Sequence, residues 1–415
     1  MDCADSIGRL AYMDIEKIRA DFPSLKKTFD GKPAIYLDNA CVSLRPRSVI
    51  EAISSYYTDF GGCARRALHG FGRATAERHE RSRAEIAAFF GVKPEETIFT
   101  RNATEAINMV ARGLGLRSGE RVITCELEHN SNLLPWQRLA QTEGITHVRI
   151  PLGKNYSIDM EELSGQLAKG ARLVSTAHIS NVTGATQPVK EICGAAHKAG
   201  ALVMIDGAQA AGHIPVDVRE IEADFYAVSF HKMLGPSGMG ALLGKRESLE
   251  TLLPLLIGGE TVTDATYENC SFSPLPWRLE AGLQDYAGAF GAASAVSYIS
   301  KLGQENIRRR EELLGGLLMD RLSRIKGLKL IGNTDWKERA PIATFLIDGV
   351  PSDQLAELLD STENIMVRAG KHCAHPWFNA NGLPPALRAS AAFYNTEAEI
   401  EKFASTVEKL SGTFF

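Results

Sequence analysis

Short apolar runs alternate with stretches of helical periodicity between about residue 85 and residue 245. The runs that have the length and composition of buried strands are 96–100, 121–124, 147–150, 173–177, 201–205 and 225–229. Helical patterns lie between several of them, for example at 103–116 and 189–199. Strands that alternate with helices predict a parallel sheet with helices on both faces. Ligands of such sheets bind beyond the carboxyl ends of the strands, so polar residues that follow each run are the candidates for a site.

The pattern changes after residue 250. Residues 250–285 are rich in glycine and proline and predict loops, and a long helical segment is expected from 286 to 325. Two apolar runs, 328–331 and 343–347, then precede a helical pattern at 352–359. This order predicts a smaller α+β domain at the C-terminus. The length also predicts two domains, because 415 residues exceed the roughly 250–300 residues at which a single hydrophobic core stops growing.

Composition and charge argue against several classes of protein. The 46 Lys and Arg residues and 50 Asp and Glu residues give a net charge of −4, so no overall charge attracts nucleic acid or acidic lipid. The longest apolar runs, such as 252–257, are far shorter than the ~20 residues that cross a bilayer. The N-terminus also lacks the basic and apolar segments of a secretory signal. We therefore expect a cytoplasmic protein that binds neither nucleic acid nor membrane.

Seven cysteines are scattered along the chain without a CxxC pair, which argues against a disulfide framework and a structural zinc site and favours a reducing compartment. Cys373 differs from the others because Arg368, Lys371, His372 and His375 surround it in the sequence. Positive and imidazole groups favour the thiolate, which is the nucleophilic form of cysteine. An inert buried thiol is the common alternative. A metal site at His372, Cys373 and His375 lacks a second ligand cluster, so no metal is expected.

The strongest local signal lies after two consecutive predicted strands. Asp206 and Gln209 follow the first, and Ser229, His231 and Lys232 follow the second. A lysine that forms a Schiff base and an acidic partner for the ring nitrogen are what pyridoxal phosphate requires. Each residue alone has an ordinary explanation as a loop residue or a helix N-cap. Together, at the ends of neighbouring strands, they favour a pyridoxal-phosphate site.

Several ordered motifs extend this interpretation to nearly the whole chain from about residue 14. They are Tyr36-Leu-Asp-Asn-Ala40, Phe99-Thr-Arg-Asn-Ala-Thr104, Glu128-His129-Asn-Ser-Asn132, His178-Ile-Ser-Asn181, Arg278-Leu-Glu-Ala-Gly282, Arg368-Ala-Gly-Lys-His372-Cys373 and Arg388-Ala-Ser390. With the motifs around Asp206 and Lys232, the sequence resembles the pyridoxal-phosphate enzymes of the class V aminotransferase fold. Within them it is similar to the group II cysteine desulfurase and selenocysteine lyase family.

The resemblance implies an α/β fold in two parts. Residues 31–285 would form a large cofactor-binding domain with a mainly parallel seven-stranded sheet covered by helices. Residues 286–415 would form a smaller α+β domain that carries the nucleophilic cysteine, and residues 1–30 would be an N-terminal segment that joins it.

The resemblance also assigns roles to residues around the cofactor and substrate. Lys232 would hold the cofactor and act as a catalytic base, with Asp206 at the ring nitrogen. His129, a further catalytic residue, would stack on the ring, and Asn181 and Gln209 would hydrogen-bond its phenolic oxygen. The phosphate ligands would be Ala103, Thr104, Ser229 and His231, and the substrate ligands would be Arg388, Asn181 and His372.

The implied reaction converts L-cysteine to L-alanine while Cys373 takes the sulfur as a persulfide. The sulfur would pass to an acceptor or iron–sulfur scaffold protein, L-selenocysteine could follow the same route, and the enzyme would be a homodimer. Some positions depart from the family: Cys41-Val42 replaces Ala-Thr, Ala103 replaces Thr, and Leu283-Gln284 replaces Thr-Pro. These changes motivate the alternative of an epimerase, aminotransferase or carbon–carbon hydrolase of the same superfamily, and Cys373 distinguishes the two because those reactions need no thiol.

Overall fold

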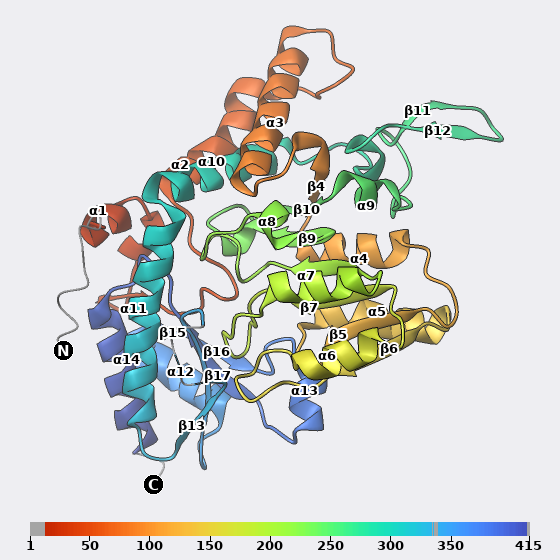
Figure 1. Cartoon of the computed structure of the whole chain (residues 1–415). Coiled ribbons are helices and arrows are strands. Elements are labelled where there is room, and N and C mark those ends of the chain that lie inside the picture. The colour runs from red at the N-terminus through yellow and green to blue at the C-terminus, as the bar shows by residue number, and fades with distance from the viewer. Residues whose placement is uncertain (1–12, 334, 336–338, 413–415) are drawn as a thin grey trace.

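The computed structural model describes residues 13–333, 335 and 339–412. Within these ranges a seven-stranded sheet, a four-stranded sheet and their covering helices make up most of the structure, and three pairs of strands form small sheets beside them (Figure 1). Of the seven cysteines, Cys3 lies outside the described residues. No helix in the described ranges is both long enough and apolar enough to cross a membrane.

The larger sheet has seven strands in the order β4-β10-β9-β8-β7-β5-β6. They are β4 (Thr97–Thr100), β5 (Arg121–Cys125), β6 (Thr146–Ile150), β7 (Leu173–Ala177), β8 (Leu202–Asp206), β9 (Phe225–Ser229) and β10 (Gly240–Gly244). Strands β5 to β9 pair in parallel, and β10 runs antiparallel to both of its neighbours. The predicted mainly parallel seven-stranded sheet is confirmed, as are the six predicted strands. Strand β10 was not predicted, because glycine stands at both ends of its apolar run.

Helices cover both faces of this sheet. One face carries α4 (Ala103–Gly113) and α5 (Asn130–Thr142), and the other carries α6 (Met160–Leu167) and α7 (Val189–Lys198) (Figure 1). Side chains along β9 alternate between the two hydrophobic cores, with Phe225 in one and Tyr226 in the other, as the pleat of a strand requires. The strands are therefore buried on both sides, and only their ends are open to a ligand.

The helical segment expected from 286 to 325 is two helices rather than one. They are α10 (Tyr286–Leu302) and α11 (Gln304–Ser323), and Gly303 between them has φ 85°. A residue with positive φ cannot continue a right-handed helix, and glycine adopts it without a Cβ clash. Helix α10 packs against α2 (Arg47–Ser55) and α3 (Gly70–Phe89) in the core of the larger sheet. The predicted domain limit at residue 285 stays a prediction.

The smaller sheet is antiparallel, with strands in the order β13-β14-β17-β16. Its strands are β13 (Leu328–Ile331), β14 (Ile342–Ile347), β16 (Arg368–Gly370) and β17 (Ala386–Ser390). They share a core with α11, α12 (Ser352–Glu363) and α14 (Glu397–Ser411). Beside this sheet, β3 (Ile35–Tyr36) pairs in parallel with β15 (Ile365–Met366). An N-terminal segment thus joins the C-terminal part of the chain.

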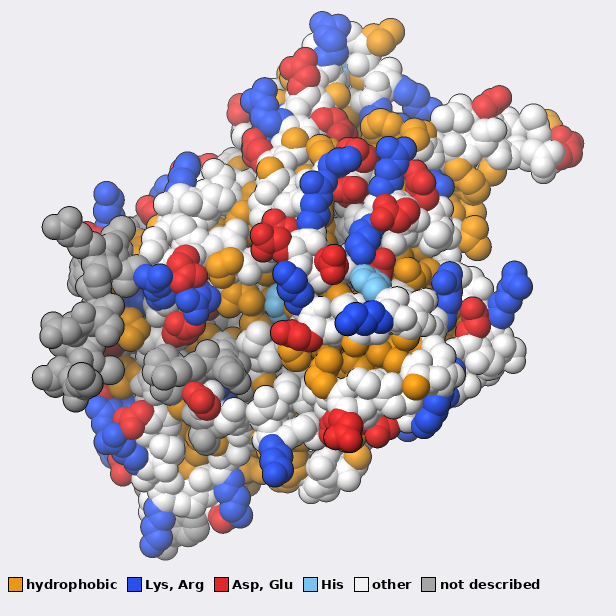
Figure 2. Space-filling model, in the orientation of Figure 1, with side chains coloured by type: hydrophobic (Ala, Val, Ile, Leu, Met, Phe, Trp, Pro, Cys, Tyr) orange, Lys and Arg blue, Asp and Glu red, His pale blue; other side chains and the backbone are white. Residues whose placement is uncertain are grey.

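The remaining elements are short. They are α1 (Ile15–Ala20), α8 (Val218–Ile221), α9 (Arg246–Glu250), α13 (His375–Ala380), β1 (Thr28–Phe29), β2 (Lys32–Pro33), β11 (Val262–Ala265) and β12 (Cys270–Phe272). The hairpin of β11 and β12 projects away from the larger sheet (Figure 1). On the face shown in Figure 2, basic and acidic side chains are interspersed. This face therefore has no large patch of like charge, which agrees with the small net charge of −4.

A buried ion pair fastens α3 to the segment that precedes α10. The Arg83 guanidinium donates to both carboxylate oxygens of Glu280, at 2.6 Å and 2.9 Å, and both side chains are almost fully buried. Glu280 also accepts the N–H of Phe99 on β4 at 2.6 Å. The pair therefore ties together a helix, a loop and an edge strand.

We expect Arg83→Met to lower the free energy of unfolding by about 3–5 kcal/mol, because the buried Glu280 carboxylate loses its counter-charge. Chemical denaturation followed by circular dichroism measures the loss. In the double variant Arg83→Met/Glu280→Gln the unpaired charge is gone and an acceptor for Phe99 remains, so part of the stability should return. A single variant as stable as the wild type would contradict this role of the ion pair.

Candidate active site

The carboxyl ends of β8 and β9 bring the predicted lysine and aspartate together. Asp206 ends β8, and Lys232 ends the 3-10 turn Phe230–Lys232 that follows β9, its parallel neighbour. Burial lowers the pKa of Lys232 and raises the pKa of Asp206, and the charge of each group opposes the shift of the other. Among the described residues no hydrogen bond reaches Lys232 Nζ, and the Asp206 carboxylate accepts only the N–H of Ala208, at 3.0 Å. Both groups are available to a ligand.

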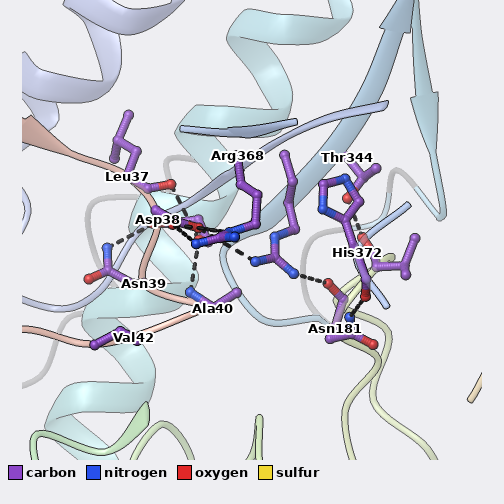
Figure 3. Close-up of polar contacts among 12 residues, drawn as sticks. Leu37, Asp38, Asn39, Ala40, Val42, Asn181, Thr344, Arg368 and His372 are labelled. Carbon is purple, nitrogen blue, oxygen red and sulfur yellow. Dashed lines mark hydrogen bonds and ion pairs between the residues drawn. The ribbon is translucent and has the colours of Figure 1, made fainter. Parts of the chain in front are cut away.

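The segment 38–42 lies beside this pair. The Gln209 side chain donates to the carbonyl of Ala40 at 2.7 Å, and the Ala40 N–H donates to Ser390 Oγ at 2.9 Å. Figure 3 shows this segment next to Arg368. The segment 38–42 thus connects the carboxyl ends of the strands in the larger sheet to β17 of the smaller sheet.

Arg388 reaches the site from β17. Its side chain is buried, its NH1 donates to the carbonyl of Asn181 at 2.9 Å, and its NH2 lies 3.6 Å from an Asp38 carboxylate oxygen. The same carboxylate binds Arg368, at 2.8 Å (Figure 3). Arg388 Nε has no partner among the described residues. The guanidinium is thereby held on two sides and keeps an N–H for a ligand.

Asp38 is a residue that the sequence interpretation missed. It lies in the Tyr36–Ala40 motif, which was a signal of importance, but nothing in the sequence relates it to Arg368 and Arg388. Glu128 is a second such residue. Its buried carboxyl group accepts hydrogen bonds from Asn132 and from residues at the end of β7, and burial raises its pKa to about 8. It joins the start of α5 to the sheet beneath the site.

The loop that contains His372 and Cys373 is held in a strained conformation. Both residues have positive φ, 47° and 55°, which costs free energy for a residue with a Cβ. The carbonyl of His372 accepts the Asn181 side-chain amide at 2.6 Å, and the carbonyl of Cys373 accepts the Asn130 N–H at 2.6 Å. These two bonds fasten the loop to the larger sheet, and the cysteine is exposed.

His372 and His129 are both neutral. His372 Nε2 lies 3.1 Å from the carbonyl of Ala386, and burial and the charge of Arg388 lower the pKa of His372 to about 3. His129 caps α5 through Nδ1, which accepts the N–H of Ser131 at 3.1 Å. Burial, Lys232 and Arg388 lower the pKa of His129 to about 3. A neutral, half-buried imidazole is suited to stack on an aromatic ring.

Most of the expected phosphate ligands meet at the start of α4. The Ala103 N–H donates to Ser229 Oγ at 2.9 Å, and Thr104 Oγ1 lies 2.7 Å from Ser131 Oγ. A helix N-terminus with hydroxyl groups suits an anion. The His231 ring has no hydrogen bond among the described residues, and burial lowers its pKa to about 4. Its role as a phosphate ligand stays a prediction.

The site therefore combines an unbonded lysine amine, a buried aspartate, a neutral histidine, an anion-binding helix end and an exposed cysteine. The family model described as Aminotransferase class-V matches residues 35–403. The chain belongs to the class V aminotransferase family. It is 37% identical to a probable cysteine desulfurase of Halalkalibacterium halodurans, over 97% of this chain and 99% of the relative.

Two solved structures have the same fold over nearly their full length. One is the apo cysteine desulfurase of Thermococcus onnurineus NA1, with a TM-score of 0.91 and 35% identity, covering 96% of this chain and 98% of that one. The other is a cysteine desulfurase of Escherichia coli, with a TM-score of 0.87 and 32% identity and the same coverage. The resemblance inferred from the motifs is thus confirmed at the level of the family.

Membership in this family makes pyridoxal phosphate the cofactor, and the residues present fit it. The Lys232 amine has no partner among the described side chains, and Asp206 has a carboxylate oxygen without a hydrogen bond at the neighbouring strand end. The hydroxyls of Thr104 and Ser229 lie at the N-terminus of α4, where a phosphate is favoured. The aldehyde, ring nitrogen and phosphate of the cofactor each have a matching group.

Proposed function

We propose that the protein is a pyridoxal-phosphate-dependent cysteine desulfurase, which converts L-cysteine to L-alanine and takes the sulfur onto Cys373. One observation carries the proposal. The Cys373 thiol is exposed on a strained loop that is bonded to Asn181 and Asn130, and it lies close enough to Lys232 for its charge to affect that amine. The other reactions of this fold need no such thiol.

Each residue then has a task that its surroundings support. Arg388 binds the substrate carboxylate with its free N–H, with Asn181 and His372 beside it. Lys232 removes the proton from the substrate α-carbon, and burial favours the neutral amine that this requires. The Asp206 carboxylate would pair with the ring nitrogen of the bound cofactor. Pyridoxal phosphate, when bound, withdraws electrons from the α-carbon.

Sulfur transfer is assigned to Cys373. Its thiolate attacks the substrate sulfur, a sulfur–sulfur bond forms, and the carbon–sulfur bond breaks with its electron pair remaining on the carbon skeleton. Protonation of that skeleton leads to L-alanine, and Cys373 keeps the sulfur as a persulfide. L-Selenocysteine has the same functional groups and would follow the same route.

The persulfide sulfur would pass to an acceptor protein, such as a scaffold for iron–sulfur clusters, in the cytoplasm. The exposure of Cys373 supports transfer to a second protein. The six cysteines among the described residues are all free thiols, which supports a reducing compartment.

A homodimer is the proposed assembly. Leu253, Leu256, Ile257 and Leu283 are each more than half exposed, and Leu256 and Leu283 line one cavity. Exposed apolar groups that lie together are typical of interfaces between proteins. Light scattering of the purified protein should return twice the 45.2 kDa of one chain. The mass of a single chain would contradict the assembly.

One assay tests the activity directly. The protein loaded with pyridoxal phosphate is incubated with L-cysteine and a reducing thiol, and alanine and sulfide are both measured. We expect the two products in equal amounts. Alanine without sulfide, or pyruvate in place of alanine, would overturn the proposal.

A further inference from the structure

His213 lies between the main chain of Lys232 and an acidic residue of a distant helix. Its Nε2 is 3.0 Å from the carbonyl oxygen of Lys232. Its Nδ1 is 3.1 Å and 3.0 Å from the two carboxylate oxygens of Glu311 on α11. The side chains of His213 and Glu311 are 12% and 3% exposed. The imidazole therefore spans the space between the site and the C-terminal part of the chain.

The partners of the ring define its protonation. A carbonyl oxygen only accepts hydrogen bonds, and so does an ionised carboxylate. Both ring nitrogens of His213 must then carry a proton, and the ring is an imidazolium paired with the Glu311 carboxylate. Burial acts to lower the pKa of His213, but the charge of Glu311 and the two hydrogen bonds outweigh it and raise the pKa.

Two further contacts hold His213 and Glu311 in place beside the loop of Lys232. Glu311 also accepts the N–H of Phe393, at 3.1 Å, in the segment that follows β17. Gly212, next to His213, has φ 83°, and a Cβ there would lie 2.5 Å from Cβ of Met233. The turn that carries His213 thus packs directly on the main chain that follows Lys232.

We propose that His213 is a positioning residue for Lys232: the imidazolium, held by Glu311, fixes the main-chain carbonyl of the residue whose side chain carries the catalytic amine. Both of its ring nitrogens are bonded to protein groups, so it acts through Lys232. The inference deepens the proposed function and rests on it, because it concerns the lysine that moves the substrate proton.

Other charged groups also lie near the ring. The charged side chains that line the same cavity wall as His213 are Glu191, Arg308, Glu311, Glu312 and Arg339. Arg308 is paired with Glu305 and Glu312, and the Lys232 charge opposes protonation of His213. Among these groups only Glu311 contacts the ring, so its carboxylate is the group whose removal should change the protonation of His213.

A matched pair of variants separates positioning from a merely structural role. In His213→Gln the amide nitrogen replaces Nε2 and still donates to the Lys232 carbonyl. In His213→Asn the shorter amide replaces Nδ1. It keeps the hydrogen bond to the Glu311 carboxylate and loses the one to the Lys232 carbonyl. Both variants remove the same ring and the same charge. They are prepared as holoproteins, and the visible absorption band of the bound cofactor is titrated against pH without substrate.

We expect His213→Asn to move the midpoint of that titration and to lower kcat by roughly 10–100-fold, since small misplacements of a catalytic group have effects of this size. KM for L-cysteine should stay near the wild-type value, because Arg388 is untouched. His213→Gln should move the midpoint less than His213→Asn, because its amide still donates to the Lys232 carbonyl although the charge and the contact with Glu311 are gone. Equal changes in the two variants, or none in either, would overturn the proposal. The titration of the cofactor band reports on Lys232 even if the protein forms no alanine. Failure of the proposed function can therefore be told apart from failure of the positioning role.

Glu311→Gln tests the imidazolium. The Gln amide can donate to a neutral His213 whose Nε2–H still reaches Lys232, so kcat should fall less than in His213→Asn. A group whose pKa is raised by folding stabilises the fold below its unfolded value of about 6.5, and this contribution is lost as pH rises through the folded pKa. The difference in stability between wild type and Glu311→Gln should therefore shrink as pH rises above neutrality. A difference that is independent of pH would overturn the charged pair.

Discussion

Replacement of Cys373 by alanine is expected to lower sulfide release from L-cysteine by at least about 10³-fold, because removal of a catalytic nucleophile can lower kcat by as much as about 10⁶-fold. The cofactor should still be bound, because the Cys373 thiol makes no hydrogen bond among the described residues and the main-chain bond to Asn130 does not depend on it. Sulfide production measured beside the visible spectrum of the holoprotein tests both statements. This variant separates sulfur transfer from every earlier step.

Other cysteines provide the controls. Cys63 and Cys270 are exposed, Cys63 beside the Tyr286 hydroxyl and Cys270 at the start of β12, and their alanine variants should keep wild-type rates. Cys41 is a sharper comparison, because this half-buried thiol also acts on the charge of Lys232. We assign the sulfur to Cys373 because of its exposure. Loss of sulfide in Cys41→Ala together with full activity in Cys373→Ala would reverse that assignment.

Lys232→Ala is expected to lower alanine formation by at least about 10³-fold, because the residue both holds the cofactor and moves the substrate proton. Loss of the amine also leaves the buried Asp206 without the charge that opposes the rise of its pKa. The bound cofactor should then exchange with solution and lose its lysine-dependent visible band. Absorbance after gel filtration measures retention, and a stopped assay measures alanine.

Lys245 is the matched control for this variant. It follows β10, which runs antiparallel to β9, so it lies at the opposite edge of the same sheet, and it pairs with Asp224. Lys245→Ala should keep both the band and the activity. Lys232→Arg keeps a positive charge but cannot form the Schiff base, so it should resemble Lys232→Ala. If Lys232→Arg were active, the covalent role of the lysine would be wrong.

Much of the larger sheet could be predicted because its signals are local. A strand buried on both faces is a continuous apolar run, and the polar residues that end it are next to it in the chain. Asp206 and Lys232 were therefore predictable as neighbours, since parallel strands present their carboxyl ends at one edge. Strand β10 escaped because a short run between Gly240 and Gly244 has no distinctive pattern. The break at Gly303 escaped because the residues on both sides of it favour a helix.

Contacts between distant segments could not be predicted in this way. Asp38 binds Arg368 and Arg388, more than 300 residues away, and Asn181 binds His372. These pairs depend on how β17 and its neighbouring loops meet the larger sheet. Hydrogen bonds of this kind have no periodicity and act over about 3 Å, so only the packed chain defines them.

The sequence by itself determined the family, the cofactor-binding residues at the strand ends and the cysteine that is proposed to carry sulfur, because these depend on residue type and on neighbours along the chain. The tertiary structure alone decided how the parts are held: Arg388 between Asn181 and Asp38, the strained loop of Cys373 against Asn130, and His213 between Lys232 and Glu311. The physical reason is range. A pattern of buried positions depends on residues that are close together in the chain. Hydrogen bonds and ion pairs instead form between whichever groups the fold brings within a few ångströms of each other.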